Sequence, residues 1–435
     1  MPPVEVLFNY EVAGAAPEGT TFTGTAISDR VVQLVDAAAA TIDLAAYNFD
    51  HAPLAAALRR AHDRGVRVRV VTDIDTRHPS LLSPTPNYFW IAVNDEGLMH
   101  HKFLVVDAGI SGSEVVVTGS TNFTDANIYR FYNDAVLLRS RELAAAFTQE
   151  FELLWGSDTA VPNAAAGRSG ADKPVRLRPR VVLEGTDVEV YFSPNQEVSE
   201  RIVEEIDRAQ ESIGFQLLIL TYDDIAQALV RAHDRGVGIF GVVENFDDNS
   251  SEVFYLQGRG VPVEGHTPEE VVHHKYGVFD AEAGDASTLI TGSHNWTYSA
   301  ETFHDENTLV VTGSAALSEL YHRAARDRYC ALVPASDCVD VVSDVSAPTT
   351  AQADVRIGPN PTRGAVTITT HESSSAALEA YRLIDASGRL VQGGQLSRSS
   401  ASHALDLSHL RPAAYVLQLR TAAGWTAGTP LLLSR

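Results

Sequence analysis

The chain has 435 residues, which at roughly 100–200 residues per domain predicts about two to four domains. Apolar residues make up 45% of it and charged residues 20%, a composition typical of globular and not of disordered proteins. The formal net charge of -23 argues against a protein that grips nucleic acid over its whole surface, because such binding needs Lys and Arg to neutralise phosphates. No apolar run approaches the ~20 residues that a membrane-spanning helix needs.

The predicted elements in the first part of the chain form a repeat. Seven residues, Arg60–Val66, recur identically at Arg231–Val237. Around both copies the pattern is that of a helix, an apolar strand, an amphipathic helix ending at Gly, and a second strand that ends at an acid. In chain order these segments are Val31–Ala39, Ile42–Tyr47, the helix before Gly65 and Val66–Thr72 before Asp73, then Ile202–Ala209, Ile213–Leu220, the helix before Gly236 and Val237–Val243 before Glu244. This alternation predicts a duplicated α/β domain with a largely buried sheet in each copy.

A second repeat lies downstream in each half and carries reactive side chains. Both halves contain His-x-Lys-x4-Asp followed by Gly-Ser-x-Asn, and the residues concerned are His100, Lys102, Asp107, Ser120 and Asn122, then His273, Lys275, Asp280, Ser293 and Asn295. One match to the first pattern has a chance expectation of about 0.01 in a chain of this composition, so a paired match is a specific signal.

The scarcity of lysine strengthens this signal. The chain has only three lysines, and two of them, Lys102 and Lys275, occupy the same motif position. Where Lys persists among basic residues that are otherwise all Arg, we infer that a compact ammonium is needed which the broader guanidinium cannot replace.

These residue types fit phosphoryl transfer. In a strand, the His and Lys of each motif are two positions apart and project on the same face. If the two halves pack about a pseudo-twofold axis, two His and two Lys converge on one pocket, where the ammoniums and the Asn amides hold the non-bridging oxygens of a phosphodiester. The candidate substrate-binding residues are Ser120, Asn122, Ser293 and Asn295. One imidazole then attacks phosphorus to form a phosphohistidine, while the other protonates the departing oxygen. The lysines supply the positive charge, so no metal or other cofactor is expected.

The duplicated motif resembles that of the phospholipase D superfamily, in its single-chain form with two motifs, over roughly residues 5–335. The resemblance implies two pseudo-twofold-related α/β lobes with mixed sheets flanked by helices. It also implies that His100 is the nucleophile and His273 the general acid. Asp107 and Asp280 complete the motifs and are expected to support the fold without reacting.

In this superfamily an acid that orients a catalytic His commonly follows Gly-Ser-x-Asn. Glu306 fits that position in the second half. The ungapped counterpart in the first half is Asn133, with Asp134 beside it, so the identity of the orienting acid there stays open. Glu306 and Asp134 are the candidate orienting acids.

Residues 355–435 differ in character from the rest of the chain. Their short alternating runs, separated by Gly and Ser turns, predict a small all-β sandwich. They resemble the C-terminal sorting domain of the type IX secretion system in Pro359–Gly364, Leu383–Arg389 and the run from Leu410 to Leu417. The resemblance implies recognition by that secretion machinery, export across two membranes, and a location outside the cell or at its surface. Export needs a signal peptide, and residues 1–5 show neither its basic nor its apolar region, so we expect a processed or shortened start.

Composition divides the chain into five segments. They are a first lobe, a linker rich in Ala, Gly, Pro and Arg, a second lobe, a second linker and the sorting domain, at residues 1–160, 161–179, 180–340, 341–354 and 355–435. The third lysine, Lys173, lies in the first linker, and we expect its replacement by Arg to be silent.

The two cysteines, Cys330 and Cys338, are not spaced like the paired CxxC ligands of a zinc site. They are either two unpaired core residues or one short disulfide of an exported protein. The resemblance to a sorting domain favours the disulfide.

Together these features predict an exported, metal-independent phosphodiesterase that is a monomer. Hydrolysis of phospholipid head groups, in contact with a membrane surface, is the leading hypothesis, and the acidic body favours a zwitterionic lipid over a polyanion. The alternative is a nuclease of the same superfamily that cleaves DNA or RNA with the same residues. A non-catalytic surface-binding protein is the least favoured hypothesis, since both motifs are intact.

Overall fold

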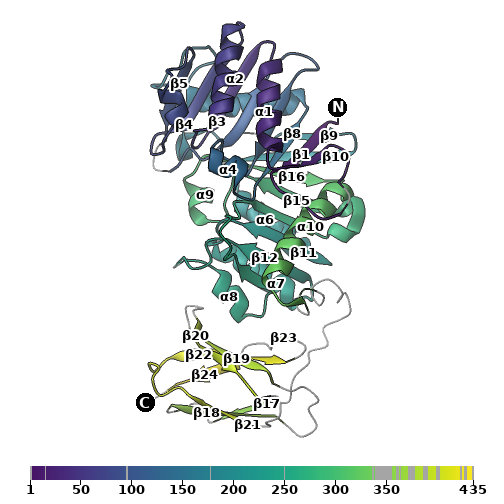
Figure 1. Ribbon diagram of the computed structural model, residues 1–435, viewed down its shortest axis with the longest axis vertical. Coiled ribbons are helices and arrows are strands. Elements are labelled where there is room, and N and C mark those ends of the chain that lie inside the picture. The colour runs from purple at the N-terminus through teal and green to yellow at the C-terminus, as the bar shows by residue number, and fades with distance from the viewer. Residues whose placement is uncertain are drawn as a thin grey trace.

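The computed structural model describes two similar lobes and a C-terminal all-β region (Figure 1). The described residues are 2–335 except 15, 95, 96, 177 and 249, then 338, 355–358, 362, 364–370, 378–385, 390–397, 402–421, 424, 425 and 429–433. The predicted second linker, 341–354, lies outside the described residues, as do most of Pro359–Gly364 and residues 386–389 of the sorting-domain pattern.

The first lobe is built on an eight-stranded mixed sheet with the order β2-β1-β8-β7-β6-β3-β4-β5. Its strands are β1 (Val4–Phe8), β2 (Thr20–Phe22), β3 (Thr41–Ala46), β4 (Arg67–Asp73), β5 (Phe89–Val93), β6 (Lys102–Val106), β7 (Val115–Gly119) and β8 (Asp134–Leu138). Its helices are α1 (Ala26–Ala37), α2 (Ala52–Asp63), α3 (Pro79–Leu82), α4 (Asp125–Tyr129) and α5 (Arg141–Trp155).

The second lobe repeats this arrangement in seven of its eight strands, with the sheet order β13-β12-β11-β14-β15-β16-β10-β9. The edge strands differ, because β2 follows β1 and pairs with it in parallel, whereas β9 precedes β10 and pairs with it antiparallel. Its strands are β9 (Arg180–Leu183), β10 (Thr186–Ser193), β11 (Ser212–Leu217), β12 (Gly238–Val243), β13 (Val263–Gly265), β14 (Lys275–Phe279), β15 (Thr288–Gly292) and β16 (Glu306–Thr312). Its helices are α6 (Val198–Arg208), α7 (Asp223–Asp234), α8 (Val253–Gly258), α9 (Tyr298–Thr302) and α10 (Ala315–Leu332). The fold class predicted from the sequence is confirmed.

The repeated seven residues explain the shared local structure. They end α2 and α7, and the glycine that follows each helix, Gly65 or Gly236, has φ near +90° (91° and 90°), which a side chain disfavours. The next residues form β4 and β12, which pair in parallel with β3 and β11. These strands are almost wholly buried, as expected of parallel strands that are covered on both faces.

One face of each sheet packs on the lobe's own helices, and the other contributes to a core shared by both lobes. The shared core includes α5, α10 and large aromatic side chains from both halves, such as Phe8, Phe103, Phe147, Phe192, Tyr276 and Tyr321. Two isolated bridges cross between the lobes, Met99 with Asp305 and Tyr132 with Val272. Equivalent positions in the two bridges lie 173 residues apart (Met99 and Val272, Tyr132 and Asp305), so a pseudo-twofold axis relates the lobes.

The C-terminal region forms a three-stranded sheet, β17-β18-β21, and a five-stranded sheet, β20-β19-β22-β23 with β24 on β22. The strands are β17 (Val355–Gly358), β18 (Ala365–Thr370), β19 (Ala380–Asp385), β20 (Leu390–Gln395), β21 (Ser402–Asp406), β22 (Ala414–Thr421), β23 (Gly424–Trp425) and β24 (Thr429–Leu432). Buried leucines between the sheets, among them Leu383, Leu405 and Leu417, make a separate small core. The predicted all-β region is thus confirmed.

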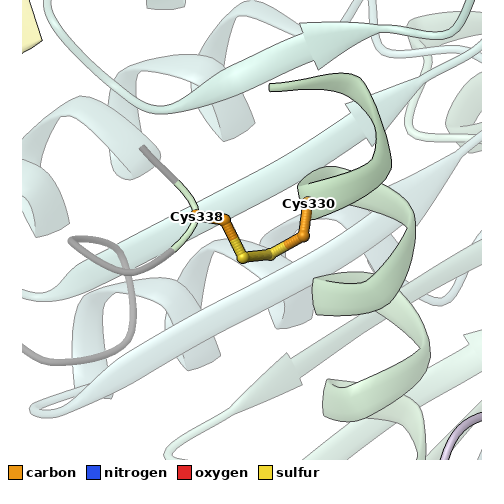
Figure 2. Close-up of a disulfide and its surroundings, with 2 residues drawn as sticks. All are labelled: Cys330 and Cys338. Carbon is orange, nitrogen blue, oxygen red and sulfur yellow. A yellow bond between two sulfur atoms is a disulfide. The ribbon is translucent and has the colours of Figure 1, made fainter. Parts of the chain in front are cut away.

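Cys330, in the last turn of α10, forms a disulfide with Cys338 (Figure 2). Of the two alternatives left open by the sequence, the structure contains the disulfide. Among the residues that the structure describes, none of the helices combines the length and the apolar character needed to cross a bilayer.

Candidate active site

The two motifs meet where the lobes join. Each motif Lys begins a central strand, β6 or β14, and each motif His stands two residues before it. The backbone of each His is held by the opposite lobe: His100 N–H donates to Asp305 O, and His273 N–H donates to Tyr132 O, both at 3.0 Å. The histidine and lysine side chains of both motifs are buried. The duplicated fold therefore brings two copies of the motif together at one site.

Two acids hold the backbone just before each motif, Asp73 at the end of β4 and Glu244 directly after β12. Asp73 Oδ2 accepts the backbone N–H of Met99 at 2.9 Å, and Glu244 Oε2 accepts that of Val272 at 2.8 Å. Each acid thus holds the residue directly before a motif His. The sequence pattern contained these acids as strand ends, but it did not suggest their contact with the motifs.

The two motif histidines have different partners. His100 Nδ1 donates to Glu306 Oε1 at 2.7 Å, a carboxylate. His273 Nδ1 donates to Asn133 Oδ1 and to Ser120 O, both at 3.0 Å, which are neutral acceptors. In both rings the bond at Nδ1 leaves the lone pair on Nε2, the atom that can attack phosphorus or exchange a proton. Only His100 has a carboxyl group behind it.

The neighbouring histidines show the opposite arrangement on the far side of the strands. His274 Nδ1 lies 2.8 Å from Asp134 Oδ1, whereas His101 Nδ1 lies 3.3 Å from Asn307 Oδ1, an amide. The structure therefore places Asp134, a candidate orienting acid, on His274 and not on His273. Burial alone would raise the pKa of Asp134, but hydrogen bonds from His274, Ser120 and Tyr321 hold it below its usual range.

The motif lysines point their ammonium groups back toward the histidines. Lys102 Nζ donates to His100 O at 2.7 Å, and Lys275 Nζ donates to His273 O at 2.6 Å. An ammonium carries three N–H donors, so each lysine keeps donors for substrate oxygens. Lys102 Nζ also lies 5.1 Å from the ring centre of Tyr47, whose ring is 4.6 Å from that of His100. Tyr47 was not predicted as a site residue, because in the sequence it only ends an apolar strand.

The motif serines are engaged inside the protein. Ser120 Oγ donates to Asp134 Oδ1 at 2.8 Å, and Ser293 Oγ accepts the backbone N–H of Asn307 at 3.0 Å. Both hydroxyls therefore tie the Gly-Ser turn to the following strand. The substrate contacts predicted for these two serines remain predictions.

The motif asparagines lie closer to the reacting groups. Asn122 Nδ2 is 3.5 Å from His273 Nε2, the ring nitrogen on the side away from Asn133. Within the described part of the chain, the buried Oδ1 atoms of Asn122 and Asn295 have no hydrogen-bond partner. The substrate contacts predicted for these two asparagines remain predictions.

The motif aspartates lie at the other end of β6 and β14, away from the lysines. Asp107 accepts hydrogen bonds from the backbone N–H groups of residues 39–41, and Asp280 from those of residues 210–212, at 2.7–3.1 Å. Both adopt left-handed backbone conformations (φ 54° and 52°), which Asp tolerates better than most residues. They hold the turns that lead into β3 and β11 and contact none of the reacting side chains.

Burial sets the charge state of the site. It lowers the pKa of His100 and of His273 well below the ordinary value, so both rings are neutral at pH 7. It lowers the pKa of Lys102 to about 7 and that of Lys275 well below the ordinary value, and it raises the pKa of Glu306 to about 8. A phosphodiester anion next to these groups favours the charged form of both lysines, so substrate binding and protonation are coupled.

Comparison with known proteins identifies the family. Residues 31–155 and 202–328 match the family described as cardiolipin synthase, PLD-like domain, and the chain belongs to this phospholipase D-like family. Residues 356–428 match the secretion system C-terminal sorting domain. Both resemblances predicted from the sequence are confirmed.

Two of the similar curated proteins and one solved structure of similar fold bear the names of lipid enzymes. The mitochondrial cardiolipin hydrolase of Homo sapiens is 33% identical over 151 residues, which are 33% of this chain and 57% of that protein. Phospholipase D of Rickettsia prowazekii is 29% identical over 131 residues, 30% of this chain and 62% of that protein. Phosphatidylserine synthase of Haemophilus influenzae shares the fold, with a TM-score of 0.53 at 13% identity over 77% of this chain and 90% of that one. The chain thus spans little more than half the length of the curated relatives it matches.

Proposed function

We propose that this protein is an exported, metal-independent phosphodiesterase of the phospholipase D type that hydrolyses phospholipid head groups. The observation that carries the proposal is the meeting of both motifs at one site, where two buried histidines and two buried lysines lie together. Two ammonium groups can balance the charge of a phosphodiester and of the transition state that follows it.

His100 is the nucleophile in this proposal. Glu306 holds its Nδ1–H, so the Nε2 lone pair attacks phosphorus, the N–P bond forms, and the bond from phosphorus to the head-group oxygen breaks. His273, protonated next to the bound anion, passes its Nε2 proton to the departing oxygen. Water then attacks phosphorus and gives a proton to His273, and the N–P bond breaks to restore a neutral His100. The products are the free head-group alcohol and a phosphatidic acid.

The lipid substrate is supported by two features. The curated relatives bear the names of a cardiolipin hydrolase and a phospholipase D. The formal net charge of -23 opposes long-range attraction of a polyanion such as DNA. A nuclease with the same residues is the competing outcome.

Initial rates on phosphatidylcholine vesicles, cardiolipin vesicles and plasmid DNA, with a chelator present and across a salt series, test the proposal. We expect lipid turnover that is nearly flat with salt, since apolar contact dominates it. Binding to duplex DNA would instead weaken with a slope of roughly −0.9 per phosphate neutralised. Fast DNA cleavage at physiological salt without lipid turnover would favour the nuclease, and loss of all activity with the chelator would overturn metal independence.

Export is the second part of the proposal. It is supported by the sorting-domain match and by the disulfide, which is typical of oxidising compartments. The full chain and a chain ending at residue 347, each carrying a signal peptide, should be expressed in a host with type IX secretion. We expect only the full chain at the cell surface or in the medium, and equal export of both would overturn the role of the tail.

A further inference from the structure

A buried cation reaches the His100 side of the site from the segment between the lobes. Lys173 is 5% exposed, and its Nζ lies 2.5 Å from Glu150 Oε1, 2.6 Å from Asp305 Oδ1 and 3.0 Å from Ser193 O. The sequence predicts that this lysine lies in a linker and that its replacement by Arg has no effect. Its burial among two carboxylates and a carbonyl contradicts that interpretation.

Each of these two acidic residues is linked to a motif residue. The backbone carbonyl of Asp305 accepts the backbone N–H of His100 at 3.0 Å, and the residue after Asp305, Glu306, holds the His100 ring. Glu150 Oε1 lies 3.1 Å from Nε2 of His101, the residue next to His100. Lys173 therefore joins α5, the end of β10 and the start of β16 around one short piece of chain, His100-His101.

Neighbouring charged groups also determine the pKa values of Glu150 and Lys173. Burial alone would raise the pKa of Glu150, but Lys173, His101 and Arg176 hold it well below its usual range. Burial would lower the pKa of Lys173, but Asp305 and Glu150 raise it above the ordinary value. Glu150 and Lys173 are thus both charged in the interior, and Arg176 is a second cationic partner of Glu150.

The second lobe has no equivalent of this cluster. Ser140 and Ser314 stand at the starts of α5 and α10, which places Ala324 where the first lobe has Glu150. Tyr132 stands where the second lobe has Asp305. Nε2 of His274 is bonded to the Tyr10 hydroxyl at 2.8 Å instead. Among the described residues, this ion cluster thus supports one motif His, His100, which is also the one hydrogen-bonded to Glu306.

We propose that Lys173 is a positioning residue for the nucleophile, because it holds Asp305 at the start of β16 and the Glu150–His101 contact in place. The inference rests on the proposed function and adds to it a residue outside both motifs. Without the ammonium, the Asp305 carboxylate loses its Lys173 contact and moves, and the Glu306 side chain shifts with it. A shift of about 1 Å in a reacting group can cost on the order of 10²-fold in rate. The broad guanidinium of Arg cannot fill the place of an ammonium among three oxygens this close.

The test compares Lys173→Met, Lys173→Arg and the charge-balanced double variant Lys173→Met/Asp305→Asn with a control. The control is Arg69→Met, which breaks another buried ion pair (Arg69 Nε to Asp43 Oδ1, 2.6 Å) that contacts none of the motif residues. We expect Lys173→Met to lower kcat about 10²-fold with little change in KM, and to slow single-turnover formation of the phosphoryl-enzyme equally. Lys173→Arg should lose part of kcat and the double variant should regain part of it. Arg69→Met should lose thermal stability but keep kcat within about twofold.

A second readout needs no substrate. In protein with 15N-labelled histidine, the Nδ1 proton of the His100–Glu306 bond, identified by its loss in His100→Asn, should shift or broaden in Lys173→Met and stay unchanged in Arg69→Met. A folded Lys173→Met with unchanged kcat and an unchanged Nδ1 signal would overturn the positioning role. A wild-type protein inactive on every phosphodiester would overturn the proposed function instead, and the Nδ1 signal would still decide the role of Lys173. If Lys173→Met does not fold, Lys173→Arg and the double variant carry the same comparison.

Discussion

The two lobes share the order of seven strands, their helices and their motifs, yet the motif histidines have different partners in the two lobes. After the Gly-Ser-x-Asn turn the first lobe has Asn133-Asp134, and the second has Glu306-Asn307. Each lobe thus keeps one amide and one acid, but in exchanged order. Successive residues of a strand face opposite sides, so the exchange moves the carboxylate from the site face to the core face. Exchanging the order of two neighbouring residues in a duplicated fold is thus enough to give the two motif histidines different hydrogen-bond partners.

The difference predicts that only one histidine forms the covalent intermediate, and this is the largest effect that we expect. His100→Ala should abolish turnover, by several orders of magnitude, because a nucleophile cannot be replaced by its neighbours. Wild-type enzyme quenched in denaturant during turnover should carry phosphate on His100 alone, as measured by mass spectrometry of its peptides. Phosphate on His273 alone would reverse the assignment of the two lobes.

Substitution of the two motif lysines tests a feature that both lobes share. Lys102→Arg and Lys275→Arg should each lose roughly 10²–10³ in kcat, the cost typical of one lost preorganised donor. Both ammonium groups are buried and donate to the carbonyl of their motif His, a geometry that a guanidinium cannot reproduce. Steady-state rates of the two variants should be similar. A variant with wild-type kcat would show that its lysine does not bind the phosphate.

Glu306→Gln removes the feature that distinguishes the lobes and should cost about 10²-fold in kcat/KM. Burial raises the pKa of Glu306 to about 8, so the carboxylate that orients His100 is lost as the pH falls through that value. Burial lowers the pKa of Lys102 to about 7, so its charge is lost as the pH rises through that value. The wild-type profile of kcat/KM should therefore be narrow and peak between these two values, and in Glu306→Gln the decrease on the acid side should disappear.

Asp134→Asn is the matched control for that profile. Its carboxylate lies on the core face, 2.8 Å from His274 and 2.9 Å from the Tyr321 hydroxyl. Its loss should lower thermal stability while the decrease on the acid side stays. A profile that loses this decrease in Asp134→Asn and keeps it in Glu306→Gln would exchange the roles of the two acids.

The sequence predicts the duplication and both motifs because they are local patterns: seven identical residues and the His-x-Lys-x4-Asp spacing. It does not predict which acid faces which histidine, because the face depends on where β8 and β16 begin, and a shift of one residue reverses it. Tyr47 and Lys173 were missed for another reason. Their partners lie far away in the sequence, as Asp305 does from Lys173, and composition in the linker carries no sign of burial. The acid Glu306, in contrast, could be predicted from its place after Gly-Ser-x-Asn.

The lobes also differ in their contacts with the C-terminal region, and this predicts the smallest effect. Gln418 Nε2 donates to Gln257 O of α8 at 3.0 Å, and Arg382 Nη2 donates to the same carbonyl at 3.2 Å. The reacting side chains all lie between His100 and Glu306, and the contacts that hold them come from the two lobes. A chain ending at residue 347 should therefore keep kcat within about twofold, as expected for changes far from a site, with at most a small decrease in the melting temperature. The measurement is the rate on phosphatidylcholine vesicles for both chains at equal concentration. A tenfold or larger loss of kcat without unfolding would mean that the C-terminal region acts on the catalytic body through the second lobe.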